Sequence, residues 1–436
     1  MFQDKKKKIY LDHAATTPID PQVLKAMMPY MEEKYGNASS IHSFGQEAMR
    51  GVNKARKQIA NFLNCSIDEV IFTSGATESN NLAIMGYIRY LKTSPVLSFI
   101  KRGIKPHIIT SQIEHPAVFA VCQAMEREGV EVTYVGVNKE GLVDVEEIKK
   151  AIKENTALVS IMYINNETGV IQPIREIGKM IEKYNKASMK RAAPNPRSTC
   201  PNASGGRGAA PACARLCRQA GRLNPRILFH TDATQAVNYC NCDTKYLHVD
   251  MLSISGHKIY GPKGIGALYL KNGIHLEPLM YGGHQENGVR SGTYNTPGIA
   301  GLGKAIELIS NPQDHLRIKK LRDKIIKNIT KKLPDVYING SMENRIPSNI
   351  NLSFKGIDGE SLMIMLDMEG VAVSTGSACA SGSHNLSHVL TAMGLSSRLA
   401  EGSIRITLGK YNTDKEIDYF VEKLVEAVNA LRKIAS

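Results

Sequence analysis

The chain has 436 residues, of which 42% are hydrophobic and 22% are charged. This balance is typical of a globular protein, and the length predicts two or three domains with a large buried core. The eight cysteines are too few for a disulfide scaffold, and no apolar stretch reaches the roughly 18 residues of a membrane span. The charged N-terminus leads into Ile9–Asp12 without a long apolar segment, so we expect no secretory signal and a cytoplasmic location.

The formal net charge of +14 invites a nucleic-acid interpretation, but the distribution of the charge argues against it. Residues 187–226 hold eight basic and no acidic side chains, and Lys5–Lys8 add four more positive charges. What remains is close to neutral. We therefore expect solvated basic segments and no nucleic acid partner, although contact between residues 187–226 and a polyanion stays an alternative.

Residues 187–226 also differ in composition from the rest of the chain. They include five Pro and nine Ala but no Ile, Val, Phe or Tyr, so they cannot bury enough apolar surface to offset their ordering entropy. We expect a disordered or outward-looping insertion between a helix ending near Lys186 and a strand starting near Ile227. A zinc site would need a fourth ligand near Cys200, Cys213 and Cys217, so no metal site is expected.

Helical and strand patterns alternate through the first two thirds of the chain. Amphipathic helices are predicted at residues 21–34, 46–63, 78–91, 116–128, 144–153 and 174–185. Short apolar strands are predicted at residues 107–110, 130–137, 158–164, 227–230, 251–254 and 265–270. Apolar strands interleaved with helices indicate an α/β fold with a mainly parallel sheet, whose ligands bind at the carboxyl ends of the strands.

A different pattern follows residue 296. Helices are predicted at residues 297–310, 312–332, 359–369, 385–393 and 413–433, and strands at 349–354, 371–374 and 403–407. This mixture indicates a smaller α+β domain. We expect residues 20–280 to form the large domain, and residues 1–19 with 281–436 to form the small one.

The strongest local signal is a lysine just past a buried strand. Ser255, His257 and Lys258 follow the strand that ends at Ile254, and a glycine-rich turn comes next. Desolvation lowers the pKa of a lysine in such a place and frees its amine to form a Schiff base, while Ser255 and His257 could hold a phosphate. The alternative is a Gly/Pro turn with an exposed lysine.

Two further segments fit a bound cofactor. Asp232 ends an apolar strand, where an acid suits a pyridinium nitrogen, although it could simply cap the next helix. Thr73–Asn81 combines a strand end, a glycine turn and hydroxyl groups at a helix start, which together can bind an anion through backbone N–H groups. Helix capping alone is the alternative for this segment. It lacks the pattern of a nucleotide P-loop.

Three single residues complete the candidate set. Cys379 lies among small residues after a strand, a setting that leaves sulfur accessible for nucleophilic attack. His115 follows a strand end, where its ring could stack or move protons, and Arg405 on a short strand could grip a carboxylate in two places. The alternatives are an inert thiol, a loop histidine and a structural ion pair. We expect the four cysteines outside such settings to be structural: Cys65, Cys122, Cys240 and Cys242.

Taken together and in order, these segments resemble the cysteine desulfurases, which are pyridoxal-phosphate enzymes of the class V aminotransferases with an aspartate-aminotransferase-like fold. The likeness covers nearly the whole chain apart from the insertion. It implies a mainly parallel seven-stranded sheet in the large domain. The matching segments are Tyr10–Pro18, Thr73–Ser79, Glu114–His115, Asn165–Glu167, Thr231–Gln235, Ser255–Pro262, Arg290–Thr293 and Gly376–Cys379.

The resemblance assigns roles to individual residues. It implies that Lys258 forms the Schiff base with pyridoxal 5'-phosphate, that Asp232 keeps the pyridine nitrogen protonated and that Gln235 bonds the phenolic oxygen. His115 is implied to stack on the cofactor ring and relay protons, and Cys379 to be the nucleophile. Thr77, Ser255 and His257 are implied to bind the phosphate, and Thr293 the phosphate of a partner subunit. Ala76 and Asn166 are implied to bind the cofactor, and Asn166 and Arg405 to hold the substrate carboxylate.

The implied reaction removes sulfur from L-cysteine, giving L-alanine and a persulfide on Cys379. The small residues around Cys379 resemble the long-loop group of the family, which passes sulfur to iron–sulfur scaffold proteins and other acceptors, so Cys379 could also touch a cluster transiently. A homodimer is implied by Thr293. Two alternatives stay open: a selenocysteine lyase or other lyase on the same scaffold, and a non-enzymatic basic protein that binds through residues 187–226.

Overall fold

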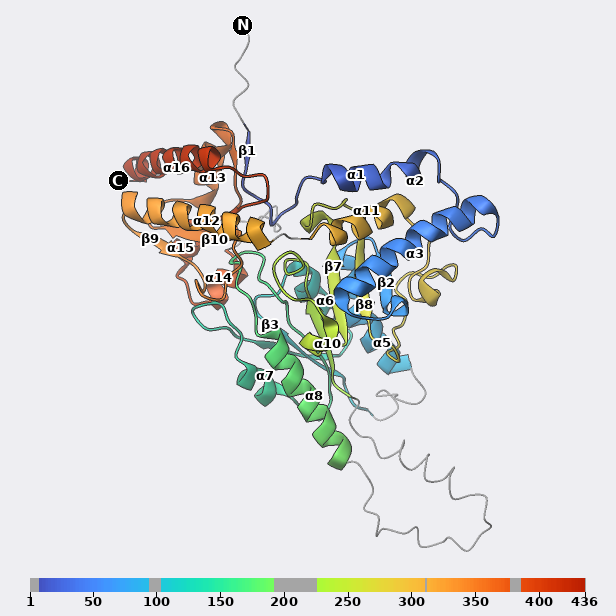
Figure 1. Ribbon diagram of the computed structural model, residues 1–436. Coiled ribbons are helices and arrows are strands. Elements are labelled where there is room, and N and C mark those ends of the chain that lie inside the picture. The colour runs from blue at the N-terminus through green and yellow to red at the C-terminus, as the bar shows by residue number, and fades with distance from the viewer. Residues whose placement is uncertain (1–7, 94–102, 192–225, 310–311, 377–385, 436) are drawn as a thin grey trace, which may run out of the picture.

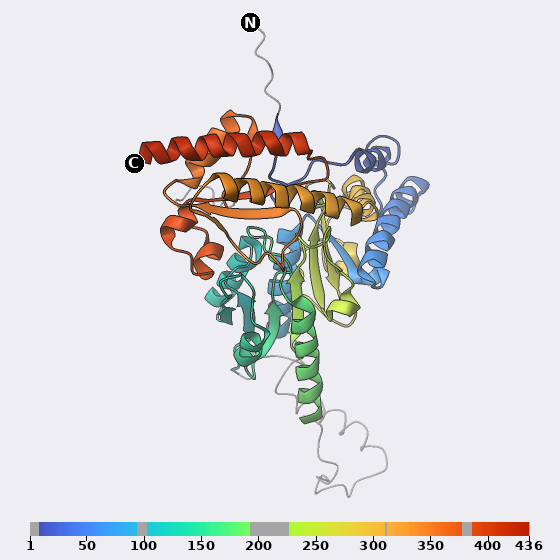
Figure 2. The same ribbon diagram turned by 60° about the vertical axis from the view of Figure 1, so that its left-hand side comes forward.

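The structure is a computed structural model that describes residues 8–93, 103–191, 226–309, 312–376 and 386–435. Figure 1 shows a large twisted sheet with helices packed around it and, beside it, a C-terminal group of helices and strands drawn in orange and red. The second view places the same C-terminal group along one side of the sheet, with the blue N-terminal strand β1 (Ile9–Tyr10) next to it (Figure 2).

The large sheet has seven strands in the order β2-β8-β7-β6-β5-β3-β4. Only β8 runs against its two neighbours, and the other pairs are parallel. The predicted mainly parallel α/β sheet is therefore confirmed. Its strands are β2 (Val70–Thr73), β3 (His107–Ser111), β4 (Glu131–Val135), β5 (Thr156–Ser160), β6 (Leu228–Asp232), β7 (Met251–Ser255) and β8 (Gly266–Leu270).

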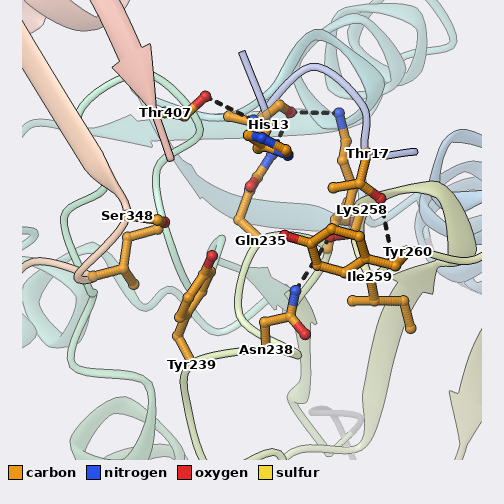
Figure 3. Close-up of a pocket in the computed structure, with 13 residues that line it drawn as sticks. His13, Thr17, Gln235, Asn238, Tyr239, Lys258, Ile259, Tyr260, Ser348 and Thr407 are labelled. Atoms are coloured by element: carbon orange, nitrogen blue, oxygen red, sulfur yellow. Dashed lines mark hydrogen bonds between the residues drawn. The ribbon is translucent and has the colours of Figure 1, made fainter. Parts of the chain in front are cut away.

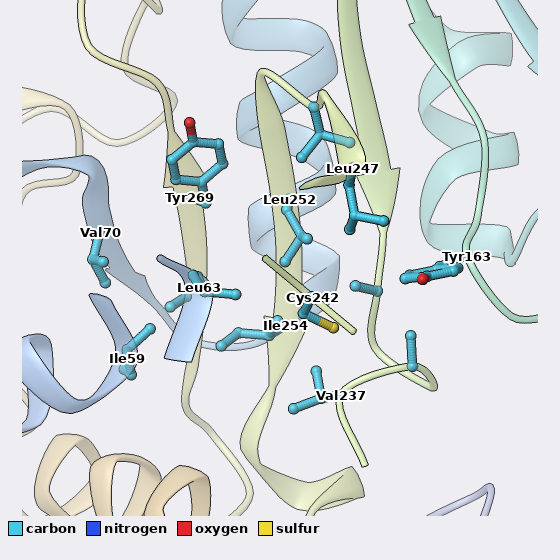
Figure 4. Close-up of a cluster of buried hydrophobic side chains, with 14 of the residues drawn as sticks. Ile59, Leu63, Val70, Tyr163, Val237, Cys242, Leu247, Leu252, Ile254 and Tyr269 are labelled. Carbon is cyan, nitrogen blue, oxygen red and sulfur yellow. The ribbon is translucent and has the colours of Figure 1, made fainter. Parts of the chain in front are cut away.

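Successive side chains of a strand point to opposite faces of the sheet, and in this sheet both faces are buried under helices. In β6, Phe229 enters one apolar cluster and Leu228 enters the other. Figure 4 shows part of the first cluster, where side chains of α3 meet β2, β7 and β8. The first face is covered by α1 (Pro21–Met27), α3 (Ser43–Leu63), α7 (Val145–Ala151), α8 (Ile174–Arg191), α10 (Thr244–Leu247) and α11 (Thr296–Glu307), and the second by the helical run α4 (Ala76–Asn81), η2 (Leu82–Gly86) and α5 (Tyr87–Thr93), with α6 (Pro116–Arg127).

The C-terminal part has its own core and its own antiparallel sheet, in the order β12-β10-β9. The N-terminal strand joins this part, since β1 (Ile9–Tyr10) pairs with β11 (Val371–Ala372). We infer that this part corresponds to the smaller α+β domain expected from the sequence. Its other elements are α12 (Pro312–Lys332), β9 (Val336–Ile338), β10 (Asn349–Phe354), α13 (Gly359–Met368), α14 (His388–Ala392), α15 (Ser397–Glu401), β12 (Ser403–Thr407) and α16 (Asp414–Ala435).

The division between the two cores lies later in the chain than residue 281, where we expected it. Helix α11 buries Ile299, Leu302 and Ile306 in the same cluster as the large sheet, and it packs along α3 and α1. The second core takes Ile318 of α12 and residues beyond it. We infer that the small domain begins near residue 312.

Two helices end at places that the periodicity did not reveal. The predicted helix 21–34 is split into α1 and α2 (Pro29–Glu32), because Pro29 has no N–H group to continue the first helix. Helix α8 continues to Arg191, past the expected end near Lys186, since the intervening residues include good helix formers. No helix within the described ranges is long and apolar enough to cross a membrane.

Candidate active site

The predicted site residues gather at one edge of the large sheet, where the carboxyl ends of five strands meet. Thr77 follows β2, His115 follows β3, and Asn166 follows β5. Asp232 ends β6, and Lys258 follows β7. These strands run in the same direction, so their carboxyl ends share one edge, the usual ligand-binding edge of an open α/β sheet.

Lys258 lies in a short 3-10 turn directly after β7 and is half-buried. Its Nζ donates to the backbone oxygens of Ala14 and Ala15, each at 2.6 Å. Figure 3 shows this amine and Gln235 both reaching the N-terminal segment, in a pocket that Ala14, Gln235 and Lys258 help to line. The Gln235 Nε2 donates to the Ala14 oxygen at 3.0 Å. One backbone carbonyl thus brings the predicted Schiff-base lysine and the predicted phenol-binding glutamine together.

Asp232 is 6% exposed and both of its carboxylate oxygens are held. Oδ2 accepts from Asn80 Nδ2 at 2.6 Å, and Oδ1 accepts from the Thr234 N–H at 2.9 Å. Asn80 comes from the helical run after β2, so contacts from two neighbouring segments fix the carboxylate. An acid fixed in this way at the centre of the strand edge can hold a protonated ring nitrogen of a bound cofactor.

The candidate phosphate site lies where the helical run after β2 begins. Gly75 adopts φ +155°, which an L side chain rarely tolerates, and leaves the first N–H groups of α4 without a side-chain cap. Ser255 lies beside Gly75, since a Cβ added to that glycine would meet the Ser255 Oγ at 3.8 Å. The exposed Thr77 and the half-buried Ala76 open α4. Backbone N–H groups and hydroxyls at a helix start form an anion site.

His257 and His115 lie on different segments of this edge. The Nδ1 of His257 lies 3.2 Å from the Thr16 Oγ1, and burial lowers the pKa of His257 to about 4. His115 is the N-cap of α6, and its Nδ1 accepts from the Ala117 N–H at 3.1 Å. Burial lowers the pKa of His115 as well, so the ring is neutral at pH 7. Because Nδ1 is an acceptor, the neutral ring carries its proton on Nε2.

Arg405 reaches the site from the small domain. It lies in the middle of β12, is 3% exposed, and forms an ion pair with Asp12 at 2.8 Å between Nη2 and Oδ1. Its Nη1 donates to the Asn166 backbone oxygen at 3.1 Å. The two residues predicted to hold a substrate carboxylate are therefore in direct contact. The buried Arg405 Nε has no partner among the described residues, which leaves a donor for a ligand.

Sequence reasoning assigned no role to the N-terminal segment 12–16, although Tyr10–Pro18 was among the matching segments. Here Asp12 pairs with Arg405, Ala14 and Ala15 accept from Lys258, and the Ala14 N–H donates to the Thr407 Oγ1 at 2.9 Å. The segment thus joins the small-domain sheet to the cofactor edge. Asn80, the partner of Asp232, was likewise missed, and its only signal was its place at the end of Thr73–Asn81.

Cys379 lies outside the described residues, as do Cys200, Cys213 and Cys217. Thr293 is exposed, and Arg290, three residues earlier, pairs with Glu78 of α4 at 2.8 Å. The four cysteines predicted to be structural are buried or half-buried, and burial raises the pKa of each thiol, which fits unreactive thiols: Cys65, Cys122, Cys240 and Cys242.

The fold and the strand-edge site correspond to a known family. The model of the family described as "Aminotransferase class-V" matches residues 9–190 and 199–420. The chain belongs to this family. The match breaks between residues 190 and 199, within the basic segment that we predicted to be an insertion.

Relatives that match over nearly all of this chain carry one activity in their names. "Cysteine desulfurase IscS" of Dictyoglomus turgidum is 44% identical, over 99% of this chain and 97% of that protein. "Cysteine desulfurase IscS" of Methanosarcina thermophila is 41% identical over 98% and 94%, and "Cysteine desulfurase" of Pongo abelii is 42% identical over 98% and 83%. The resemblance found in the sequence is thus confirmed.

Solved structures agree with the fold. A structure named "NIFS-LIKE PROTEIN" superposes with a TM-score of 0.81 at 35% identity, covering 98% of this chain and all of the other. A second, named "SspA in complex with cysteine", has a TM-score of 0.74 at 34% identity and covers 93% of this chain and 100% of its own.

Proposed function

We propose that this protein is a cysteine desulfurase that uses pyridoxal 5'-phosphate to remove sulfur from L-cysteine, leaving L-alanine and a persulfide on Cys379. The observation that carries the proposal is the strand edge where Lys258, Asp232 and Gln235 converge, in a chain whose full-length relatives are named for this activity. The structure named as a complex with cysteine, from a related chain, supports the choice of substrate.

The residues present fit the cofactor. Asp232 supplies a fixed carboxylate for the ring nitrogen, Lys258 supplies an amine, and the helix start after Gly75 supplies N–H donors for a phosphate. Two hydroxyls beside Asp232 are buried without a partner among the described residues, as expected where a polar ligand belongs: Thr231 Oγ1 and Thr234 Oγ1. When bound, the cofactor provides an electron sink for the carbanion formed at the amino acid's α-carbon.

The chain's own residues perform the remaining steps in this proposal. Arg405 and Asn166 hold the substrate carboxylate, and Lys258 moves the α-proton. The Cys379 thiolate attacks the substrate sulfur, so that an S–S bond forms, the C–S bond breaks and its electrons remain with the carbon skeleton. His115 donates or relays a proton through Nε2, because its Nδ1 is occupied by the Ala117 N–H.

Several finer features belong to the same proposal. We expect a cytoplasmic homodimer in which Thr293 reaches the partner subunit's phosphate, and its exposure supports this placement. We also expect the Cys379 persulfide to be passed to an iron–sulfur scaffold protein or another sulfur acceptor. The name "Cysteine desulfurase IscS" on several relatives supports membership of the sulfur-supplying group.

The test is to supply the purified protein, loaded with pyridoxal phosphate, with L-cysteine and a reductant. We expect alanine and sulfide in equal amounts, and a mass increase of one sulfur atom on Cys379 when the reductant is left out. Selenocysteine is the comparison substrate. Turnover of selenocysteine without turnover of cysteine would favour the lyase alternative and contradict the proposal.

A further inference from the structure

A buried carboxylate that the proposed mechanism does not use lies between the two domains. Glu167 follows β5 by seven residues, is 4% exposed and directly follows Asn166. Its Oε2 accepts the hydroxyl proton of Ser387 at 2.5 Å. The same oxygen packs against Gly376, where an added Cβ would collide with it. One carboxylate thus contacts the chain at two places eleven positions apart in sequence.

The backbone around Glu167 is fixed from both domains. Asn165 Oδ1 accepts from the N–H groups of Glu167 and Thr168 at 3.0 and 2.9 Å. The side-chain amides of Asn349 and Asn351 on β10 both donate to the Glu167 carbonyl at 3.2 Å. Side-chain amides that hold a buried backbone in this way fix the point from which the Glu167 side chain extends.

The surroundings of the carboxylate connect it to the substrate side of the site. Asn351 lies opposite Arg405 in the β10–β12 pair, and Arg405 also bonds the Asn166 carbonyl next to Glu167. Burial raises the pKa of Glu167 to about 7, although the Ser387 hydroxyl and the Arg405 charge act in the opposite direction. In either protonation state the carboxyl group keeps an oxygen that can accept from Ser387.

We propose that Glu167 is a positioning residue for the sulfur-transfer step, which fixes Gly376 and Ser387 relative to Arg405. The inference rests on the proposed function. Residues 377–385, which include Cys379, lie between these two positions and outside the described part of the chain. Arg405 holds the substrate in the proposed function. When Gly376 and Ser387 are fixed relative to Arg405, the two ends of the segment that carries Cys379 are fixed relative to the substrate sulfur that its thiolate must reach. A misplacement of about 1 Å in such an arrangement can cost roughly 100-fold in rate.

The test separates two stages of the reaction in the cofactor-loaded protein. Exchange of the α-hydrogen of L-alanine for deuterium, followed by NMR, needs Lys258 but not Cys379. Persulfide formation on Cys379 in a single turnover with L-cysteine, followed by alkylation and mass spectrometry, needs both. We expect Glu167→Ala to slow persulfide formation about 100-fold and to leave exchange within about threefold of the wild type.

Two further variants sharpen the result. Glu167→Gln keeps an oxygen for the Ser387 hydroxyl and should restore persulfide formation to within about threefold of the wild type. Ser387→Ala should behave as Glu167→Ala does, and it also provides the test if Glu167→Ala fails to fold. Because Ser387 also caps α14, the matched control is Asp358→Ala, which removes the cap of α13 at its Ser361 N–H and should leave both rates unchanged.

Some outcomes would overturn the inference. Exchange and persulfide formation falling together would mean that Glu167 acts on the cofactor or on Arg405. Persulfide formation at the wild-type rate in both Glu167→Ala and Ser387→Ala would mean that neither contact positions the chain. A wild-type protein that exchanges the α-hydrogen of alanine but never forms a persulfide would contradict the proposed function, which is a separate failure.

Discussion

The proposed cofactor site and the proposed substrate-carboxylate site are built in different ways. Asp232, Gln235 and Lys258 all come from the large sheet, at a strand end or a few residues past one. Arg405 instead comes from the middle of a strand in the small domain, and it meets the large domain through Asp12 and Asn166. The cofactor site therefore takes its side chains from one sheet and meets the N-terminal segment through the Ala14 and Ala15 carbonyls, whereas the substrate site depends on how the two domains sit together.

This difference explains which features could be read from the sequence. Lys258 and Asp232 were predicted because a buried apolar strand followed by a polar side chain leaves a clear pattern. The resemblance supplied Gln235 and the substrate role of Arg405, but not the Asp12–Arg405 pair or the Ala14 and Ala15 carbonyls.

Contacts between residues hundreds of positions apart leave no local pattern, and backbone carbonyls carry no side-chain signature at all. The core division at α11 was missed for a related reason. Its amphipathic pattern predicts a buried face but not the sheet on which that face packs.

The largest effect should come from replacing Cys379, because the cofactor site and the substrate site together present the substrate sulfur to this residue. Cys379→Ala is expected to lower desulfuration on the order of 10³-fold or more, because the sulfur loses its acceptor. Deuterium exchange at the α-carbon of L-alanine should continue, since the cofactor edge is intact. Sulfide release and NMR exchange measure the two quantities. Equal loss of both would place Cys379 in the cofactor site.

Arg405→Ala tests the region shared by the two domains. Losing charged hydrogen bonds to the substrate carboxylate is expected to lower kcat/KM by about 10- to 100-fold, mostly through KM. Steady-state kinetics with L-cysteine measures this, and the absorption spectrum of the bound cofactor should not change. A changed absorption spectrum with an unchanged KM would show that Arg405 acts on the cofactor and not on the substrate carboxylate.

Asn80→Ala tests the cofactor edge, where we expect an effect on cofactor binding and not on KM. Asp232 would lose its 2.6 Å bond from Asn80 but keep the Thr234 N–H. We expect weaker cofactor binding by about 5- to 10-fold, the net contribution of one typical hydrogen bond, with KM for L-cysteine little changed. Fluorescence titration of the apoprotein with pyridoxal phosphate measures it. A pure KM effect would contradict the assignment.

Glu114→Gln should have the smallest effect on activity but a clear effect on stability. Burial raises the pKa of Glu114 to about 8 from an ordinary 4.5, so the folded protein holds its proton at neutral pH. The contribution of this protonation to the free energy of unfolding is fully present below pH 4.5 and is lost as the pH rises through 8.

The amide introduced by this substitution mimics the protonated acid and keeps an oxygen for the Ser111 hydroxyl and the Met162 N–H, the two groups that Glu114 Oε1 accepts from. We expect the variant to lose less stability than the wild type between pH 5 and pH 8, by a few kcal/mol at most. Urea unfolding across this range measures the difference. Parallel pH profiles for the two proteins would show that Glu114 is ionised in the folded state.

The central claim is that the amine of Lys258 holds the cofactor at the strand edge. The most direct measurement is borohydride reduction of the protein loaded with pyridoxal phosphate, followed by peptide mass spectrometry, on the wild type and on Lys258→Ala. We predict one modified lysine in the wild type, Lys258, and none at that edge in the variant. Modification of a different lysine, or no modification of the wild type, would contradict the account.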